Sequence, residues 1–272
     1  MAKNRQSGST DITRIGGLPL APSFMGKDGR EGTDELREKM RPPRIKVVQD
    51  IGSEELRERG MSPGDVLMMP SGIRLCSGSE KYDEVQWLRV TPIYFFMEWC
   101  KWNDIAFKGR GFPILERSFD STSEIARKAR DPDKRKEPIP GEQDKFYLYV
   151  EHLNFVIAIH GVDGMQGVPC VVSFHRGEHK IGTRFSEFVA MRQAAIYGGI
   201  YEIGSTRHKN PQYQWWGLDV RNPPENPWVD EGTYAEMKKG YDAFKELHEN
   251  REIEVPYDDG AEEQQSPDKS EY

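Results

Sequence analysis

Cysteine is scarce in this 272-residue chain, which contains only Cys76, Cys100 and Cys170 and no CxxC pair. Three widely spaced cysteines argue against a disulfide framework and against a zinc knuckle. No apolar run approaches the roughly 18 residues of a membrane-spanning helix. The first residues also lack the apolar stretch of a signal peptide, so we expect no membrane partner and a location in the cytoplasm.

The common catalytic signatures are missing too, since the chain has no P-loop, no GxSxG elbow and no HExxH motif. One loose pattern remains, in which Asp163 precedes Glu178-His179-Lys180. This spacing is found in metal-dependent nucleases, where two acids hold Mg²⁺ and a lysine supports the attacking water. A metal-dependent nuclease is therefore one alternative. Otherwise we expect no cofactor and no bound metal.

Charge is distributed unevenly, although the formal net charge is only −7. Residues 256–272 contain six acidic residues and one lysine, so the preceding 255 residues carry a net charge of −2. Residues 173–210 contain six Lys or Arg against three acidic residues. The overall negative sign does not exclude a nucleic-acid partner, because a basic stretch is separated from an acidic tail.

Composition divides the chain into three regions. Residues 1–40 are rich in Gly, Ser, Lys and Glu and predict a flexible arm, and residues 256–272 predict a disordered acidic tail. Residues 41–255 are expected to form a single β-rich nucleic-acid-binding domain. Its aromatic and β-branched segments predict one long or two consecutive strands at 84–102, a long strand or a hairpin at 145–161, a strand at 168–177 and a hairpin over 199–220.

Helices are expected to be few. A short one fits residues 53–59, and Ser121 with Glu124 forms a capping box before another. Thr183 is expected to cap a third helix, and Thr233 with Glu236 a fourth. Strands dominate, so the predicted fold is mainly β (α+β): an OB-like curved β-barrel with peripheral helices.

Two segments, residues 175–185 and 205–216, interleave cations with aromatic rings. Single-stranded nucleic acid is held by cations along its backbone and by rings stacked on its bases, so these segments predict a nucleic-acid-binding surface. The alternative is that the rings are core residues on alternating strands. The candidate phosphate contacts are Arg176, Lys180, Arg184, Arg207 and Lys209, and the candidate stacking rings are Phe174, Tyr213 and Trp215.

A second candidate is the loop at residues 108–112, in which Lys108 and Arg110 alternate with glycines. Glycine lets the backbone approach a phosphate closely, and the flanking cations suit its charge. Such loops are also frequent in ordinary turns, so Lys108 and Arg110 are predicted contacts of low specificity.

Four segments resemble a family of tailed-bacteriophage early-region proteins. They are RPPRIKVVQ (41–49), the PGD turn (63–65), the aromatic strand at 85–99, and the run from YEIGSTRHKNPQYQWW (201–216) to the YDAF sequence ending at 244. Separately, the acidic tail with its terminal Tyr272 is similar to the tails of phage and bacterial single-stranded DNA-binding proteins. Their core is an OB-fold, and their tails recruit replication and recombination partners. Here Lys269 interrupts the tail, and Tyr272 stands where those proteins more often have Phe.

These observations and resemblances lead to one expectation. The chain is expected to be a non-catalytic single-stranded DNA-binding protein that acts in phage DNA replication, recombination or repair, in the host cytoplasm. With five phosphate contacts, log K would fall with log salt at a slope of about −3.5. Two alternatives remain: the metal-dependent nuclease, and a non-enzymatic virion or host-interaction protein. The chain is also a candidate for homo-oligomerisation.

Overall fold

A computed structural model describes residues 42–50, 54–103, 114–163, 165, 168–209, 214–253 and 255. It also describes two short paired strands, β1 (Arg14–Ile15) and β2 (Leu18–Pro19). The remainder of the predicted arm and the predicted acidic tail lie outside the described residues. All statements below concern the described part of the chain.

The fold is organised around two long neighbouring strands, β6 (Leu88–Asn103) and β9 (Phe146–His160). Both are single strands, where the sequence left open two strands or a hairpin. Their aromatic and β-branched residues favour extended backbone and pack on both faces. Pro92 is the fifth residue of β6, and the register with β9 shifts between Pro92 and Tyr94. This irregularity is where a residue without an N–H fits in a central strand.

Eight strands follow one another in the sheet in the order β12-β11-β6-β9-β10-β3-β4-β5. The remaining bounds are β3 (Arg44–Val47), β4 (Val66–Met69), β5 (Ile73–Cys76), β10 (Pro169–Phe174), β11 (Tyr201–Lys209) and β12 (Gln214–Arg221). The pair β10–β3 is parallel, and the other paired strands of the sheet are antiparallel. Two further strands, β7 (Ile114–Ser118) and β8 (Lys136–Pro138), pair with β6 and β9.

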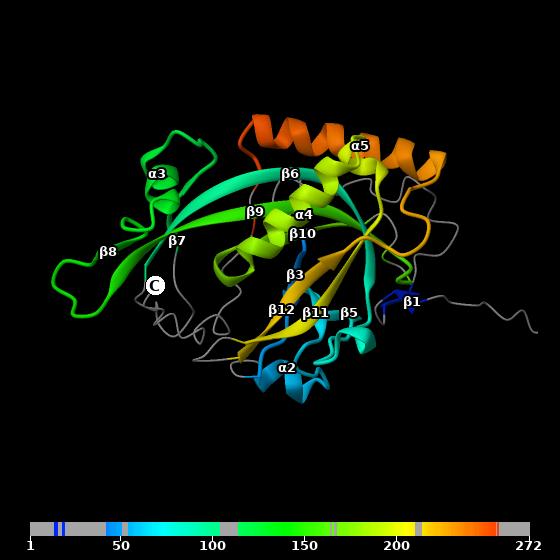
Figure 1. Ribbon diagram of the computed structural model, residues 1–272, viewed down its shortest axis with the longest axis horizontal. Helices are drawn as coiled ribbons and strands as arrows, with labels where there is room; N and C mark the ends of the chain where they lie inside the picture. Colours follow the sequence, from blue (N-terminus) through cyan, green and yellow to red (C-terminus); the bar gives the residue numbers. More distant parts are fainter. Residues whose placement is uncertain are drawn as a thin grey trace, which may run out of the picture.

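The sheet curls so that its two ends approach each other. Gln49, which follows β3, donates from Nε2 to the Trp216 carbonyl of β12 at 2.7 Å and accepts the Trp216 N–H at 3.1 Å. An isolated bridge between Ser79 and Thr206 also joins the region after β5 to β11. The result is a curled half-barrel with an inner and an outer face (Figure 1).

Helix α4 (His179–Met191) packs on the inner face. Its Phe185 is fully buried, and its ring centroid lies 4.6 Å from Phe155 of β9 and 5.3 Å from Tyr201 of β11. Trp216, Leu218 and Val220 of β12 point into the same core. The inner core is therefore closed by a helix where the curled sheet alone would leave it open.

Helix α5 (Glu231–Glu249) covers the outer face of β6 and lies above it in Figure 1. Met237 is buried there, and Tyr241 and Phe244 pack beside it. The hydroxyl of Tyr94 in β6 bonds to Nδ1 of His248 at 2.9 Å. Tyr234 and Leu247 of the same helix are 40% and 37% exposed, so its apolar face is only partly covered.

Three of the predicted helix starts are wrong in detail. Helix α3 (Glu124–Arg130) is capped by Ser123, whose hydroxyl accepts the Ala126 N–H, and α5 is capped by Asp230, which accepts the Thr233 N–H. Thr183 lies inside α4 and donates to the His179 carbonyl. Each segment contains several residues that could serve as the N-cap, and tertiary packing determines at which of them the helix begins.

The predicted fold class is confirmed: the chain is mainly β, and its curled sheet with peripheral helices is consistent with an OB-like β-barrel. The short helix α2 (Glu54–Glu58) and the hairpin β11–β12 are also where the sequence predicts them. Among the described helices, none has the length and apolar character needed to span a membrane.

Candidate nucleic-acid interface

The two cation-rich segments predicted from the sequence meet in space. The first forms the turn between β10 and α4, and the second forms the hairpin β11–β12. Glu178 in the turn accepts the backbone N–H of Leu218 in β12 at 2.8 Å. A Cβ atom on Gly177 would lie 3.7 Å from the Trp215 indole. The turn is therefore packed against the free edge of β12, beside Trp215.

At this junction two rings are stacked on each other. His208 and Trp215 are opposite residues of the hairpin, and their ring centroids lie 5.5 Å apart with an interplanar angle of 19°. Both residues are partly exposed. A Cβ on the neighbouring Gly217 would lie 2.8 Å from the His208 ring, so only glycine lets this ring lie flat beside the strand. Sequence reasoning identified Trp215 but did not include His208.

Three of the predicted cations, on the turn, the helix and the hairpin that meet here, have no ion-pair partner among the described residues: Arg176, Lys180 and Lys209. Lys180 and Lys209 are exposed, and Arg176 is partly buried. Arg176 directly precedes Gly177, Lys180 lies in the first turn of α4, and Lys209 ends β11. Their charges are available to an anionic ligand.

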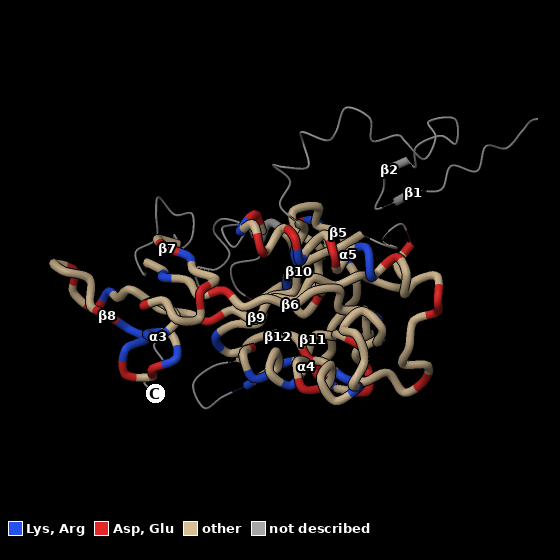
Figure 2. The backbone as a smooth tube through the Cα atoms, turned by 90° about the horizontal axis from the view of Figure 1, so that it is seen from above, with Lys and Arg blue, Asp and Glu red and all other residues tan. Residues whose placement is uncertain are grey.

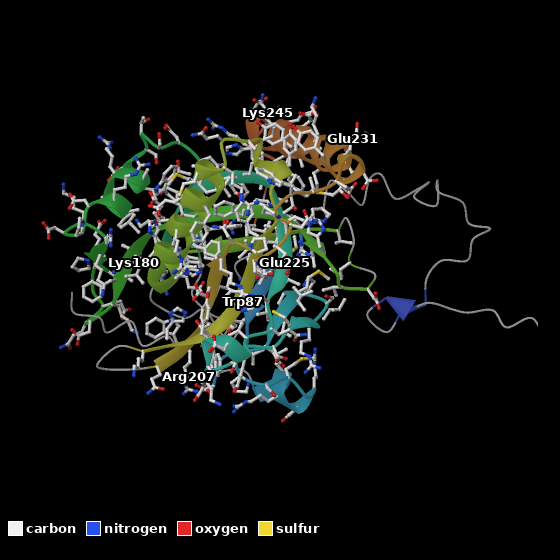
Figure 3. The ribbon with its side chains drawn as sticks, turned by 45° about the vertical axis from the view of Figure 1, so that its right-hand side comes forward. Trp87, Lys180, Arg207, Glu225, Glu231 and Lys245 are labelled. Atoms are coloured by element: carbon white, nitrogen blue, oxygen red, sulfur yellow. The ribbon has the colours of Figure 1, made fainter. Side chains whose placement is uncertain are left out.

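Two other predicted phosphate contacts are engaged by carboxylates. Arg184 of α4 forms an ion pair with Asp219 of β12. Arg207 forms ion pairs with Asp50 and Glu80, both at 3.1 Å. Arg207 also stacks on Trp216, which faces the inner core, whereas Trp215 faces outward. Figure 3 shows Arg207 at the lower tip of the hairpin, apart from Lys180. These two arginines are already paired with carboxylates, so they offer less unpaired charge to an anionic ligand than the three cations above.

Phe174 is not a stacking platform. Its side chain is fully buried, with its ring 6.0 Å from Phe155 and 6.2 Å from Phe185. The alternation of β10 turns Phe174 inward, because its opposite residue in β9 is the core residue Leu153. Tyr213, Lys108 and Arg110 lie outside the described residues, so their predicted roles stay predictions.

The basic residues of α3 are dispersed among acids, as Figure 2 shows for the projecting arm formed by α3 and β8. Lys128 is held by Glu137 at 2.7 Å and by Glu124 at 3.0 Å. Its hydrogen bonds to Glu137, Tyr149 and Glu124 raise the pKa of the ammonium group above its usual value. This arm presents mixed charge and is not part of the candidate interface.

The acid pair of the nuclease alternative is separated in space. Asp163 follows β9 near the start of β10, whereas Glu178 follows the end of β10. Six residues of β-strand span about 20 Å, which is far beyond a shared ion. Burial also raises the pKa of the Glu178 carboxyl to about 7, which does not suit a carboxylate that must hold a metal ion. No group of His, Cys, Asp and Glu in the described part of the chain fits a metal ion.

Sequence reasoning missed a second polar site, on the outer face of the sheet. Glu98 of β6 and His152 of β9 are opposite residues, and both are completely buried. Nδ1 of His152 lies 3.3 Å from the Ser173 hydroxyl of β10. Polar residues at alternate positions of otherwise apolar strands were the available signal, since alternation places them on one face.

The relation of this chain to known proteins comes from one match. The model of a family described as Pam3 phage gp34-like protein matches residues 16–250. No curated protein and no solved structure gives a match to the chain. Because the match spans most of the 272 residues, the chain belongs to the Pam3 phage gp34-like protein family.

Proposed function

We propose that this phage-family protein binds single-stranded DNA without catalysis and serves in replication, recombination or repair. The observation that carries the proposal is the outward His208–Trp215 ring pair, packed beside Gly177. Flat rings stack on bases of any sequence, which suits a protein that must cover strands of arbitrary sequence. A duplex keeps its bases stacked inside, so the ring pair favours the single-stranded form.

The cations around the rings supply the second part of the mechanism. Arg176, Lys180 and Lys209 would neutralise phosphates and release their counterions, giving affinity that falls with salt. Arg184 and Arg207 are excluded from this set by their carboxylate partners. The expected number of phosphate contacts therefore drops from five to about three, and the slope of log K against log salt from about −3.5 to about −2.

The stacking contribution is tested by Trp215→Ala, with Trp228→Ala as the matched control. Trp228 is 45% exposed but lies near the end of α4, where Arg192 covers its ring. A stacked base contributes roughly 1–3 kcal/mol, so Trp215→Ala should weaken binding of an unstructured oligonucleotide by about tenfold or more. Trp228→Ala should leave it unchanged. Fluorescence anisotropy with a labelled oligonucleotide measures both.

Equal affinity of the two variants and the wild type would contradict the proposal. Absence of binding by the wild type would also contradict it and would favour the virion or host-interaction alternative.

A further inference from the structure

The missed site is a row of buried polar side chains that crosses the outer face of five strands. Arg117 of β7 donates to Glu98 of β6 at 3.3 Å, and Glu98 faces His152 of β9. His152 contacts Ser173 of β10, and Arg44 of β3 lies beyond it, opposite Val171. Burying such groups is unfavourable unless they are hydrogen-bonded, so their concentration in one row calls for a specific role.

The row reaches the surface at His175 and Arg176, in the turn before α4. The His175 ring lies 4.6 Å from the His152 ring, which in turn stacks on Trp102 at 6.0 Å. The Arg176 guanidinium lies over the same Trp102 ring, 5.8 Å from its centroid. Arg176 and His152 thus both lie against the Trp102 indole, and His175 lies against His152.

Two polar groups at this end of the row have no partner. Nδ1 of His175 is buried and has no hydrogen bond within the described part of the chain. The Arg176 guanidinium has no ion pair with any described residue and is held only over the Trp102 ring. Burial, followed by the charges of Arg176 and Arg44, lowers the pKa of His175 to about 3 and keeps the ring neutral. A neutral ring can still donate an N–H to an anion.

The backbone at Arg176 is also unusual. Its φ is +47°, in the left-handed region that residues other than glycine rarely adopt. Such conformations persist where the surrounding structure requires them, and they concentrate at ligand sites. Here the Arg176 guanidinium lies over the Trp102 ring, and its charge acts on the neighbouring His175 ring by lowering its pKa after burial has done so.

We propose that His175 and Arg176 bind a phosphate monoester, the terminal phosphate of a DNA strand. A guanidinium and an adjacent imidazole N–H match two oxygens of a phosphate dianion. The buried position of Nδ1 favours a group at the end of a chain over a phosphate in the middle of a continuous strand. Gly177 links this site to the ring pair, so a strand stacked on Trp215 would have its end nearby. The assignment of this phosphate to the end of a DNA strand rests on the proposed function, whereas the binding of a phosphate at His175 and Arg176 does not.

The test compares oligonucleotides of one sequence with a 5′-phosphate, a 3′-phosphate or hydroxyls at both ends. The variants are Arg176→Gly and, as the matched control, Lys180→Gln. Glycine adopts the positive φ readily, so Arg176→Gly removes the guanidinium while keeping the turn. Lys180→Gln removes an exposed cation from the same surface but outside the row.

One phosphorylated end should bind the wild type about tenfold more tightly than hydroxyl ends, since a charge-assisted contact is gained. Arg176→Gly should abolish this difference, and Lys180→Gln should keep it while weakening all three oligonucleotides. Equal affinity of the three oligonucleotides for the wild type would overturn the terminal-phosphate proposal while leaving DNA binding intact.

If no oligonucleotide binds, titration with inorganic phosphate still tests whether His175 and Arg176 form a phosphate-binding site. The His175 ring resonances of the wild type should shift on adding phosphate, and those of Arg176→Gly should not. Such shifts would assign the site to a free phosphate or small phosphate ester. No shift in the wild type would overturn the site altogether.

Discussion

Glu178 sets a pH dependence at the scale of a single residue. Its carboxyl accepts the Leu218 N–H, and no basic side chain lies near enough to offset its burial, so its pKa rises to about 7 from 4.5. The folded protein therefore binds this proton more tightly than the unfolded chain. The resulting stability is present at acidic pH and is lost as pH rises from about 4.5 through 7.

Glu178→Gln should remove this dependence, because an amide oxygen still accepts the Leu218 N–H and never ionises. At pH 8 the variant should unfold with a free energy roughly 2–3 kcal/mol higher than the wild type, and at pH 4 the two should be nearly equal. Urea unfolding at both pH values measures the difference. Glu187→Gln, at an exposed position of α4, is the control and should match the wild type. A wild type with a higher free energy of unfolding than Glu178→Gln at pH 8 would contradict the raised pKa of Glu178.

At the scale of the element, α4 carries the junction on which the interface depends. Its first residue, His179, bonds to Glu151 of β9 at 2.9 Å, and this bond lowers the pKa of the Glu151 carboxyl. Farther along, Phe185 fills the inner core between β9 and β11. The helix therefore fixes the turn bearing Arg176 relative to the hairpin bearing Trp215.

Phe185→Ala should destabilise the protein by about 3–5 kcal/mol, the usual range for truncating a buried phenylalanine. Met191→Ala, at a 77% exposed position near the end of the same helix, should change stability by less than about 0.5 kcal/mol. Chemical denaturation followed by tryptophan fluorescence compares them. Similar stabilities of the two variants would show that α4 does not close the core.

The elements also show what could be predicted from the sequence and what could not. The long apolar segments predicted the strands β6, β9 and β10, because alternation and β-branched residues are local signals in the sequence. The pairing of Arg207 with Asp50 and Glu80 could not be predicted, since the curl of the sheet creates it. Phe174 was misplaced for a different reason: period-two alternation gives two faces but does not say which one is inside.

At the scale of the whole molecule, the distribution of charge is expected to influence the affinity for DNA. Removing residues 256–272 changes the formal net charge from −7 to −2. An acidic segment tethered to a protein that binds DNA competes with the strand for the same cations. The truncated protein should therefore bind single-stranded DNA more tightly at low salt, with the difference shrinking as salt screens the tail. Anisotropy titrations of the two proteins measure this, and equal low-salt affinities would refute competition by the tail.

The central claim is that three cations and a stacked ring pair hold a single strand, and the salt dependence of oligonucleotide affinity tests it most directly. Anisotropy titrations of the wild type over a series of salt concentrations should give a slope of log K against log salt of about −2 for an unstructured single strand. A duplex of the same length should bind more weakly at every salt concentration. A flat salt dependence, or a duplex bound as tightly as the single strand, would contradict the account.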